Sequence, residues 1–148
     1  MFKSCRFPYG IKMEESGALS VFPAVTIILR TKKGEELSVV ALIDSGATIS
    51  AMPKNIAPLL GIDCKKGKVL RIYGVGNKRV TAWQHDVTIE LGGNTMILPV
   101  AFLDDNAIPR ILGRGGLFEK FIIIFDEQKQ RTLFLEPKAR SRIDSLIP

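Results

Sequence analysis

An acidic residue follows directly on an apolar run in residues 39–50, whose sequence is VVALIDSGATIS. A carboxylate at the end of a core strand is partly removed from water, which suits a group that gives and takes protons. Gly46 allows the backbone to turn closely and present its N–H group, and the Ser45 hydroxyl can hold the loop in place. This pattern indicates that Asp44 is a catalytic acid or base.

The same three residues also have a purely structural interpretation. Asp44 could begin a turn in which its side chain accepts a hydrogen bond from the N–H group of Gly46 or Ala47, a common arrangement for Asp-Ser-Gly after a strand. Taken alone, the tripeptide favours that interpretation. A catalytic role for Asp44 therefore depends on the rest of the sequence.

Two further segments carry glycines at positions where a backbone could approach a ligand. Residues 72–77 (IYGVGN) form a glycine-rich tip between two predicted strands, and residues 111–118 (ILGRGGLF) lead from an apolar pair into glycines. Neither segment fits a phosphate-binding loop. The first is not followed by Lys-Ser or Lys-Thr at the start of a helix, and the second lacks the dinucleotide-binding spacing. Structural turns are the alternative interpretation of both segments.

In this order and spacing, the three segments resemble the retropepsin-like, or retroviral-type, aspartic proteases, and the resemblance covers about residues 21–135. It implies a mostly β fold, a single-domain closed β-barrel of the acid-protease type with one or two short helices. It also implies an aspartic endopeptidase, a hydrolase that cuts peptide bonds. The site residues that the resemblance carries over are catalytic Asp44, active-site loop residues Ser45, Gly46 and Ala47, flap residues Tyr73, Gly74, Val75 and Gly76 over the substrate, and supporting residues Gly113 and Arg114.

The sequence departs from the family pattern beside the implied site. Thr48 stands four residues after Asp44, where the best-known viral enzymes have an acid. The acid that often pairs with the family's arginine, here Arg114, is therefore missing at that position. Gly115 and Gly116 also stand where relatives often place a larger polar residue, so the segment that follows could dock differently.

Dimerisation follows from a count of candidate aspartates. An aspartic protease needs two carboxylates that share one proton, because two like charges in contact cannot both ionise cheaply. The chain contains one Asp-Ser-Gly, and its only other Asp-Ser, at Asp144, continues into Leu146. The second aspartate is therefore expected from a second copy of the chain across a two-fold axis. No metal or organic cofactor is implied, and the expected partners are a second subunit and a peptide or protein substrate.

Short apolar runs alternate with turn residues along most of the chain, which predicts a mainly β domain. We expect residues 1–20 to be an N-terminal arm outside the core, residues 21–136 to form the protease domain, and residues 137–148 to be a tail, either a docking helix or disordered. Helices are predicted over residues 53–60 and 116–120. The predicted strands are residues 25–30, 37–43, 69–73, 80–91, 95–102, 121–125 and 132–135.

The composition excludes several other classes of protein. The 148 residues, 46% of them hydrophobic, fit one domain, and no apolar run reaches the ~20 residues that span a bilayer. Cys5 and Cys64 lie far apart and His85 is the only histidine, which excludes a zinc site of thiolates or histidines. The basic residues behind the net charge of +6 are scattered, and no aromatic residues alternate with them to stack nucleic-acid bases. We expect a soluble, cytoplasmic protein without membrane or nucleic-acid partners.

Two alternatives to a protease stay open. A retropepsin-like fold could persist as a catalytically inactive module that dimerises or binds peptides, because a fold can outlast its chemistry. The retention of Asp44, Ser45 and Gly46 together argues against that alternative. A basic nucleic-acid-binding protein would instead show salt-dependent binding to DNA or RNA.

Overall fold

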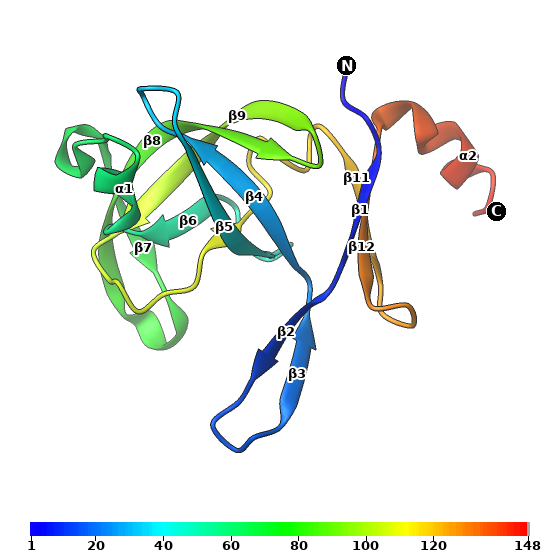
Figure 1. Cartoon of the computed structure of the whole chain (residues 1–148), viewed down its shortest axis with the longest axis horizontal. Helices are drawn as coiled ribbons and strands as arrows, with labels where there is room; N and C mark the ends of the chain where they lie inside the picture. Colours follow the sequence, from blue (N-terminus) through cyan, green and yellow to red (C-terminus); the bar gives the residue numbers. More distant parts are fainter. Residues whose placement is uncertain (148) are drawn as a thin grey trace.

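Strands dominate the computed structural model, which describes residues 1–147 (Figure 1). None of the helices in these residues is long and apolar enough to cross a membrane. The helices are α1 (Ile56–Leu59) and α2 (Arg140–Asp144), and the 3₁₀ turns are η1 (Cys64–Lys66), η2 (Val75–Asn77) and η3 (Pro137–Ala139). The strands are β1 (Cys5–Pro8), β2 (Gly10–Met13), β3 (Leu19–Phe22), β4 (Ala24–Arg30), β5 (Glu36–Ile43), β6 (Ser50–Pro53), β7 (Lys68–Tyr73), β8 (Arg79–Leu91), β9 (Asn94–Leu103), β10 (Ile111–Leu112), β11 (Ile122–Asp126) and β12 (Arg131–Leu135).

Seven strands form the main sheet, in the order β4-β5-β10-β6-β9-β8-β7. The sheet curls until β4 meets β8, but these strands join through only two residue pairs, Ile28 with Glu90 and Leu29 with Ile89. The mostly β, single-domain class with two short helices is therefore confirmed, whereas the barrel is not strictly closed. The reason lies in β8, which is 13 residues long and whose first part pairs with β7 in a hairpin beyond the barrel.

Alternating side chains along the strands build the core. In β4, Val25, Ile27 and Leu29 are buried, and the residues between them are more exposed. The same period of two buries Val87 and Ile89 in β8. Because β4 and β8 meet at the ends of the curled sheet, these side chains join one apolar cluster, whose removal from water is the main favourable term in folding.

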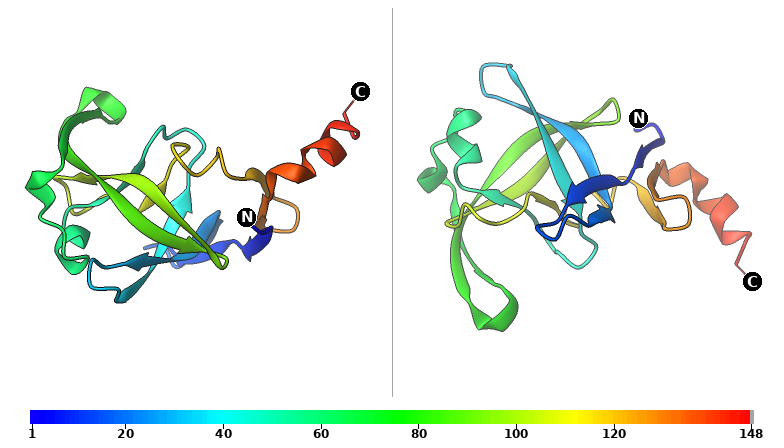
Figure 2. Two further views of the ribbon diagram at one scale, coloured as in Figure 1. Left: turned by 90° about the horizontal axis from the view of Figure 1, so that it is seen from above. Right: turned by 60° about the horizontal axis from the view of Figure 1, so that its bottom comes forward.

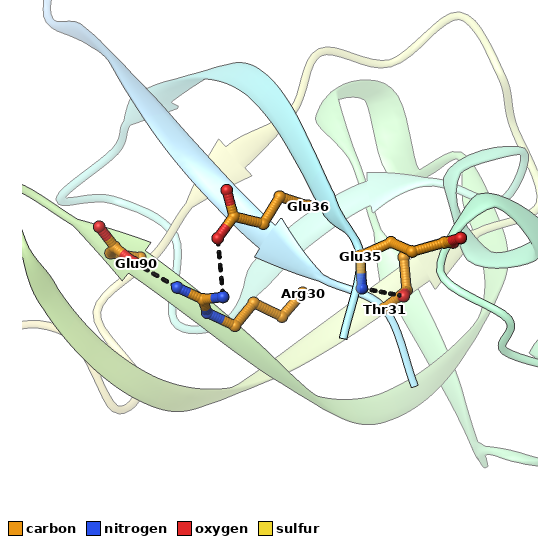
Figure 3. A network of polar contacts seen from close by, with 5 residues as sticks. All are labelled: Arg30, Thr31, Glu35, Glu36 and Glu90. Carbon is orange, nitrogen blue, oxygen red and sulfur yellow. Dashed lines mark hydrogen bonds and ion pairs between the residues drawn. The ribbon is translucent and has the colours of Figure 1, made fainter. Parts of the chain in front are cut away.

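The seam between β4 and β8 carries a network of ion pairs (Figure 3). Arg30, the last residue of β4, donates hydrogen bonds to Glu36 of β5 at 2.8 Å and to Glu90 of β8 at 2.7 Å. The hydrogen bond to Glu90 and the charge of Glu36 raise the pKa of the Arg30 guanidinium. The Thr31 hydroxyl accepts the N–H group of Glu35 at 2.9 Å in the turn from β4 to β5. One arginine thus bridges three strands where the barrel is held by few backbone pairs.

Replacement of Arg30 with glutamine is expected to lower the melting temperature by about 2–4 °C, because two partly exposed charged hydrogen bonds are lost at the seam. The difference should shrink in about 0.5 M NaCl, since salt screens exposed charges. Thermal unfolding followed by circular dichroism measures both effects. Lys12→Gln serves as a control, because Lys12 lies 4.0 Å from Glu14 on an exposed hairpin. An Arg30 variant that melts like the wild type at low salt would contradict this role.

A second sheet, of order β1-β12-β11, brings the two ends of the chain together. Cys5 of β1 pairs with Phe134 of β12, the Phe7 ring packs edge-on against Phe134 at 5.7 Å, and Tyr9 is buried. Burial also raises the pKa of the Tyr9 phenol. The expectation that residues 1–20 lie outside the core is therefore wrong for residues 5–9, whose alternate apolar side chains face inward as in a strand. β2 and β3 do project as a separate hairpin (Figure 1).

The two predicted helices have different outcomes. α1 forms one turn inside the predicted residues 53–60, and Gly61 follows it with a φ of 70°. The helix predicted over residues 116–120 is wrong, because Gly116 has a φ of 75°, outside the right-handed helical region, and residues 115–120 form turns.

The predicted tail contains a helix. η3 and α2 follow β12, and no residue of either is buried. α2 extends from the body at the end opposite the β7–β8 hairpin, as both views in Figure 2 show. The last residue of the predicted tail, Pro148, lies outside the described residues.

Candidate active site

Asp44 follows the end of β5, in a loop that passes around the end of β10. On one side β10 pairs with β5 in parallel, with Leu112 opposite Ile43, and on the other it pairs with β6 in antiparallel, with Ile111 opposite Ala51. The N–H group of Asp44 donates to the carbonyl of Leu112 at 3.0 Å. The loop thus leaves the sheet on one side of β10 and returns on the other, so both of its ends are held by the same short strand.

The carboxylate of Asp44 is half-buried and is held by its own loop. Its Oδ1 atom accepts a hydrogen bond from the N–H group of Gly46 at 2.8 Å, and the N–H group of Ala47 lies 3.3 Å from the Asp44 carbonyl oxygen. No other hydrogen bond from residues 1–147 reaches this carboxylate. The turn of the structural interpretation is therefore present. It also fixes the direction of one carboxylate oxygen while the other has no protein partner within the described chain.

Gly113 brings a second segment of backbone against the loop of Asp44. A Cβ atom at Gly113 would lie 2.5 Å from the carbonyl oxygen of Ile49 and 2.9 Å from that of Ala47, so no side chain fits there. The N–H group of Gly113 donates to Ser50 Oγ at 3.1 Å, and Ser50 is completely buried. Glycine at this position therefore allows close contact with the loop, which explains a supporting role for Gly113 in physical terms.

The two residues after Gly113 continue this support through their backbone. The N–H group of Arg114 donates to the Ala47 carbonyl at 2.8 Å, and that of Gly115 donates to the Thr48 carbonyl at 3.0 Å. Arg114 is exposed, and its guanidinium takes part in none of the ion pairs among residues 1–147. Arg114 therefore contacts the loop through its backbone. Thr48, which stands where relatives have an acid, offers the Arg114 guanidinium no carboxylate to pair with.

Sequence reasoning missed two residues that position this loop. Ser50 is one, and a serine inside an otherwise apolar segment was its only local signal. Arg110 is the other: its Nε atom donates to the Val40 carbonyl at 2.7 Å, and its own carbonyl accepts the N–H group of Leu42 at 2.9 Å. These contacts hold the chain that leads into β10 along β5, just before Asp44. They depend on the pairing of distant strands and have no local signal.

The residues predicted to form a flap lie at the tip of the β7–β8 hairpin. Tyr73 pairs across the hairpin with Arg79, and the N–H group of Gly74 donates a hydrogen bond to the Lys78 carbonyl at 3.0 Å, which closes the turn. Gly76 has a φ of 78°, a left-handed conformation that glycine adopts readily. Of Val75 only the backbone, within η2, is described.

An apolar cluster joins β7 of this hairpin to the loop of Asp44. Ile49 comes from the loop that carries Asp44, and Leu70 and Ile72 come from β7. Because these side chains pack against the same buried residues, the hairpin and the loop of Asp44 belong to one apolar cluster. The buried members are Ala82, Ala101 and Leu103, and the partly buried members are Ile49, Ala51, Leu70, Ile72, Val80 and Ile108.

An open groove of about 510 Å³ runs beside the strand that leads to Asp44. Leu42, two residues before Asp44, contributes to its wall, and Ile108 belongs both to this wall and to the apolar cluster. Its walls are mainly apolar, with four polar or charged residues among them. Its lining residues are Lys12, Glu14, Ser20, Phe22, Val40, Leu42, Ile108, Pro109 and Arg110.

Several polar groups away from the Asp44 loop have partners within the fold. Lys54 pairs with Asp104, whose hydrogen bond raises the pKa of Lys54, and Asp105 accepts the N–H group of Ala107 at 2.9 Å. His85 contacts the Cys64 carbonyl oxygen through Nε2 at 2.8 Å. No group of three or more metal-ligating side chains gathers among residues 1–147.

Comparison with known proteins points to one family. The sequence model of the family described as Aspartyl protease matches residues 30–115, which include the Asp44 loop, the tip of the β7–β8 hairpin and Gly113. A retropepsin-like aspartic protease from Rickettsia conorii is similar in structure, with a TM-score of 0.57 and 20% identity over 90% of this chain and 96% of that one, which confirms the predicted retropepsin-like fold. The EIAV protease complexed with the inhibitor HBY-793 matches with a TM-score of 0.47 and 23% identity over 63% of this chain and 82% of that one. No curated protein sequence matches this one significantly.

Proposed function

The chain belongs to the aspartyl protease family, and we propose that it is a homodimeric endopeptidase whose two Asp44 side chains, one from each subunit, activate a water molecule. One observation carries this proposal. The loop of Asp44 is held at both ends by β10, and one carboxylate oxygen is fixed by the N–H group of Gly46. A half-exposed carboxylate held in a defined direction is what water activation needs.

The surface position of the loop supports a shared site. Ser45 and Gly46 are exposed and Asp44 is half-buried in the single chain. A second copy related by a two-fold axis would place the same loop opposite, so that two Asp44 carboxylates meet and the exposed residues become covered. A single chain supplies one such carboxylate, which leaves the reaction without its acid partner.

In the proposed dimer the two Asp44 carboxylates share one proton. The ionised carboxylate takes a proton from water as the water oxygen attacks the carbonyl carbon of the scissile bond, while the protonated carboxyl group donates a hydrogen bond to the carbonyl oxygen. The C–N bond of the tetrahedral intermediate then breaks. The leaving nitrogen takes the proton that the first carboxylate removed from water, so the dyad again holds one proton and the products are a carboxylic acid and an amine. No covalent bond to the enzyme forms.

The neighbouring surfaces fit an extended peptide. The β7–β8 hairpin acts in this proposal as a flap that covers the bound chain and excludes water, and its backbone groups add hydrogen bonds to the substrate. The groove beside Leu42 and the apolar cluster around Ile49 supply apolar walls near Asp44.

A catalytically inactive, peptide-binding or dimerising module is the second candidate. The hydrogen bond from Gly46 to Asp44 is the contact that a purely structural aspartate would make, and Thr48 replaces the family's acid. Such a module would bind peptides without cutting them, so turnover separates the two candidates.

The shared site is tested by mixing subunits. Wild-type protein that cleaves a mixed peptide library between about pH 4 and 7 is refolded with an equal amount of Asp44→Asn protein. Activity per wild-type chain should fall to about half, because random pairing places half of the wild-type chains in dimers with one aspartate. Refolding with Asp105→Asn protein is the control and should leave activity per wild-type chain unchanged. Unchanged activity with the Asp44 variant would contradict a site shared between subunits, and a folded wild type that binds but never cuts peptides would favour the inactive module.

A further inference from the structure

The β7–β8 hairpin carries an uncompensated positive charge. Residues 68–79 contain four basic residues and no aspartate or glutamate, in a chain whose net charge is +6. All four basic residues are exposed, and none takes part in the seven ion pairs found among residues 1–147. By contrast, Arg30, Lys54 and Arg131 each pair with an acid. The four residues are Lys68, Arg71, Lys78 and Arg79.

The outer face of the hairpin combines two of these cations, Arg71 and Arg79, with an aromatic side chain. Leu70 and Ile72 pack into the apolar cluster, so Arg71 and Tyr73, which alternate with them, point to the opposite face. Tyr73 is 60% exposed, and the guanidinium of Arg79, its cross-strand partner, lies 5.4 Å from the centre of its ring. A guanidinium that rests on an aromatic ring keeps its N–H groups free for a carboxylate.

The folded chain gains nothing from this charge pattern. Like charges close together on a hairpin repel and lower its stability, and alternating acids and bases would keep the same surface soluble at no such cost. The inner face needs apolar residues for packing, but the outer face places no demand on the sign of the charge. A negatively charged ligand would offset the repulsion.

The position of the hairpin indicates the nature of that ligand. It extends from the body of the fold (Figure 2), and Leu70 and Ile72 on its inner face belong to the same cluster as Ile49 of the Asp44 loop. A polypeptide bound at Asp44 would continue past the hairpin, so that residues on either side of the cleaved bond come within reach of its long basic side chains. One exposed tyrosine does not provide the row of aromatic rings on which single-stranded nucleic acid stacks.

We infer that the β7–β8 hairpin recruits acidic segments of a protein substrate to the Asp44 site, and that the enzyme prefers cleavage sites flanked by aspartate or glutamate. This inference rests on the proposed endopeptidase function. The attraction acts at a distance and raises the rate of encounter, so it appears in kcat/KM and depends on salt.

The test compares two peptides that share a central sequence cut by the wild type and differ only in flanks of three glutamates or three glutamines. We expect kcat/KM to be about tenfold higher for the glutamate peptide at low salt, and the ratio to fall toward one in about 0.5 M NaCl. The triple variant Arg71→Gln, Lys78→Gln, Arg79→Gln should show a ratio near one at low salt. The matched control Lys32→Gln, Lys33→Gln, Lys129→Gln removes the same charge from exposed residues elsewhere and should keep the wild-type ratio.

The outcomes separate this inference from the proposed function. A wild type that cuts both peptides equally well, or a triple variant that keeps the preference, would overturn the inference and leave the endopeptidase standing. If the wild type cuts neither peptide, the proposed function fails, and fluorescence anisotropy with the Asp44→Asn protein still tests the hairpin. Tighter binding of the glutamate peptide then supports an acidic polypeptide ligand. If a single-stranded oligonucleotide of equal charge bound more tightly than the glutamate peptide, the proposal of an acidic polypeptide ligand would be overturned in favour of nucleic acid.

Discussion

Replacement of Asp44 with asparagine is expected to reduce peptide hydrolysis by at least about 10³-fold, because the amide can neither take a proton from water nor share one with its partner. The fold should survive. The Oδ1 atom of asparagine can still accept the hydrogen bond that Gly46 donates at 2.8 Å, and the side chains have nearly the same shape. Initial rates of peptide cleavage measure the loss, and the melting temperature of the variant verifies the fold.

A matched control exists elsewhere in the chain. Asp105 is also half-buried and accepts a hydrogen bond from an N–H group two residues later, that of Ala107, at 2.9 Å. Asp105→Asn should therefore repeat the local structural effect of the Asp44 change and leave hydrolysis within about twofold of the wild type. If Asp44→Asn retained more than about a tenth of wild-type activity, the catalytic group would have to be sought at another residue.

The second large effect is expected at Gly113. An alanine there would place its Cβ atom 2.5 Å from the carbonyl oxygen of Ile49, which is backbone and cannot move aside without displacing the catalytic loop. We expect Gly113→Ala to lower the free energy of unfolding by about 2–4 kcal/mol and to abolish measurable hydrolysis, because overpacking here also strains the hydrogen bond to buried Ser50. Chemical denaturation gives the change in free energy.

Gly74→Ala provides the stability control for this prediction. A Cβ atom at Gly74 would meet nothing closer than the Lys78 carbonyl oxygen at 3.8 Å, and the backbone there is extended, with a φ of −92°. Its free energy of unfolding should stay within about 0.5 kcal/mol of the wild type. A Gly113 variant as stable as the Gly74 variant would show that the loop and residue 113 are less tightly packed than the structure indicates.

The long strands could be predicted from the sequence because their side chains alternate over many residues. β4, β5, β7, β8, β9 and β12 all fall within one residue of the expected ends, since the period of two is a local property of each run. β10 could not be predicted from alternation of side chains. It has two residues, and it exists as a strand only because β5 and β6 lie on either side of it. The backbone conformation of Gly116, which excludes the expected helix, is likewise invisible in a sequence that merely contains a glycine there.

The candidate site shows the same division. Asp44 and Gly113 could be proposed as site residues because a resemblance to a family marks short motifs, and each motif is local. How Gly113 supports the loop could not be predicted, because its contacts with Ile49 and Ser50 join segments far apart in the chain. The roles of Arg110 and of the backbone of Arg114 follow from the same strand register. The N-terminal strand β1 was missed because four residues are too few for alternation to stand out against a charged neighbourhood.

The dependence of the Asp44 loop on β10 also has a consequence for the protein during its synthesis. When Asp44 leaves the ribosome, the residues that hold its loop, Leu112 to Gly115, have not yet been made. The carboxylate therefore has no fixed direction until much of the chain has emerged. In the proposed enzyme, hydrolysis can therefore begin only after residues 112–115 have been made and have packed against the loop of Asp44.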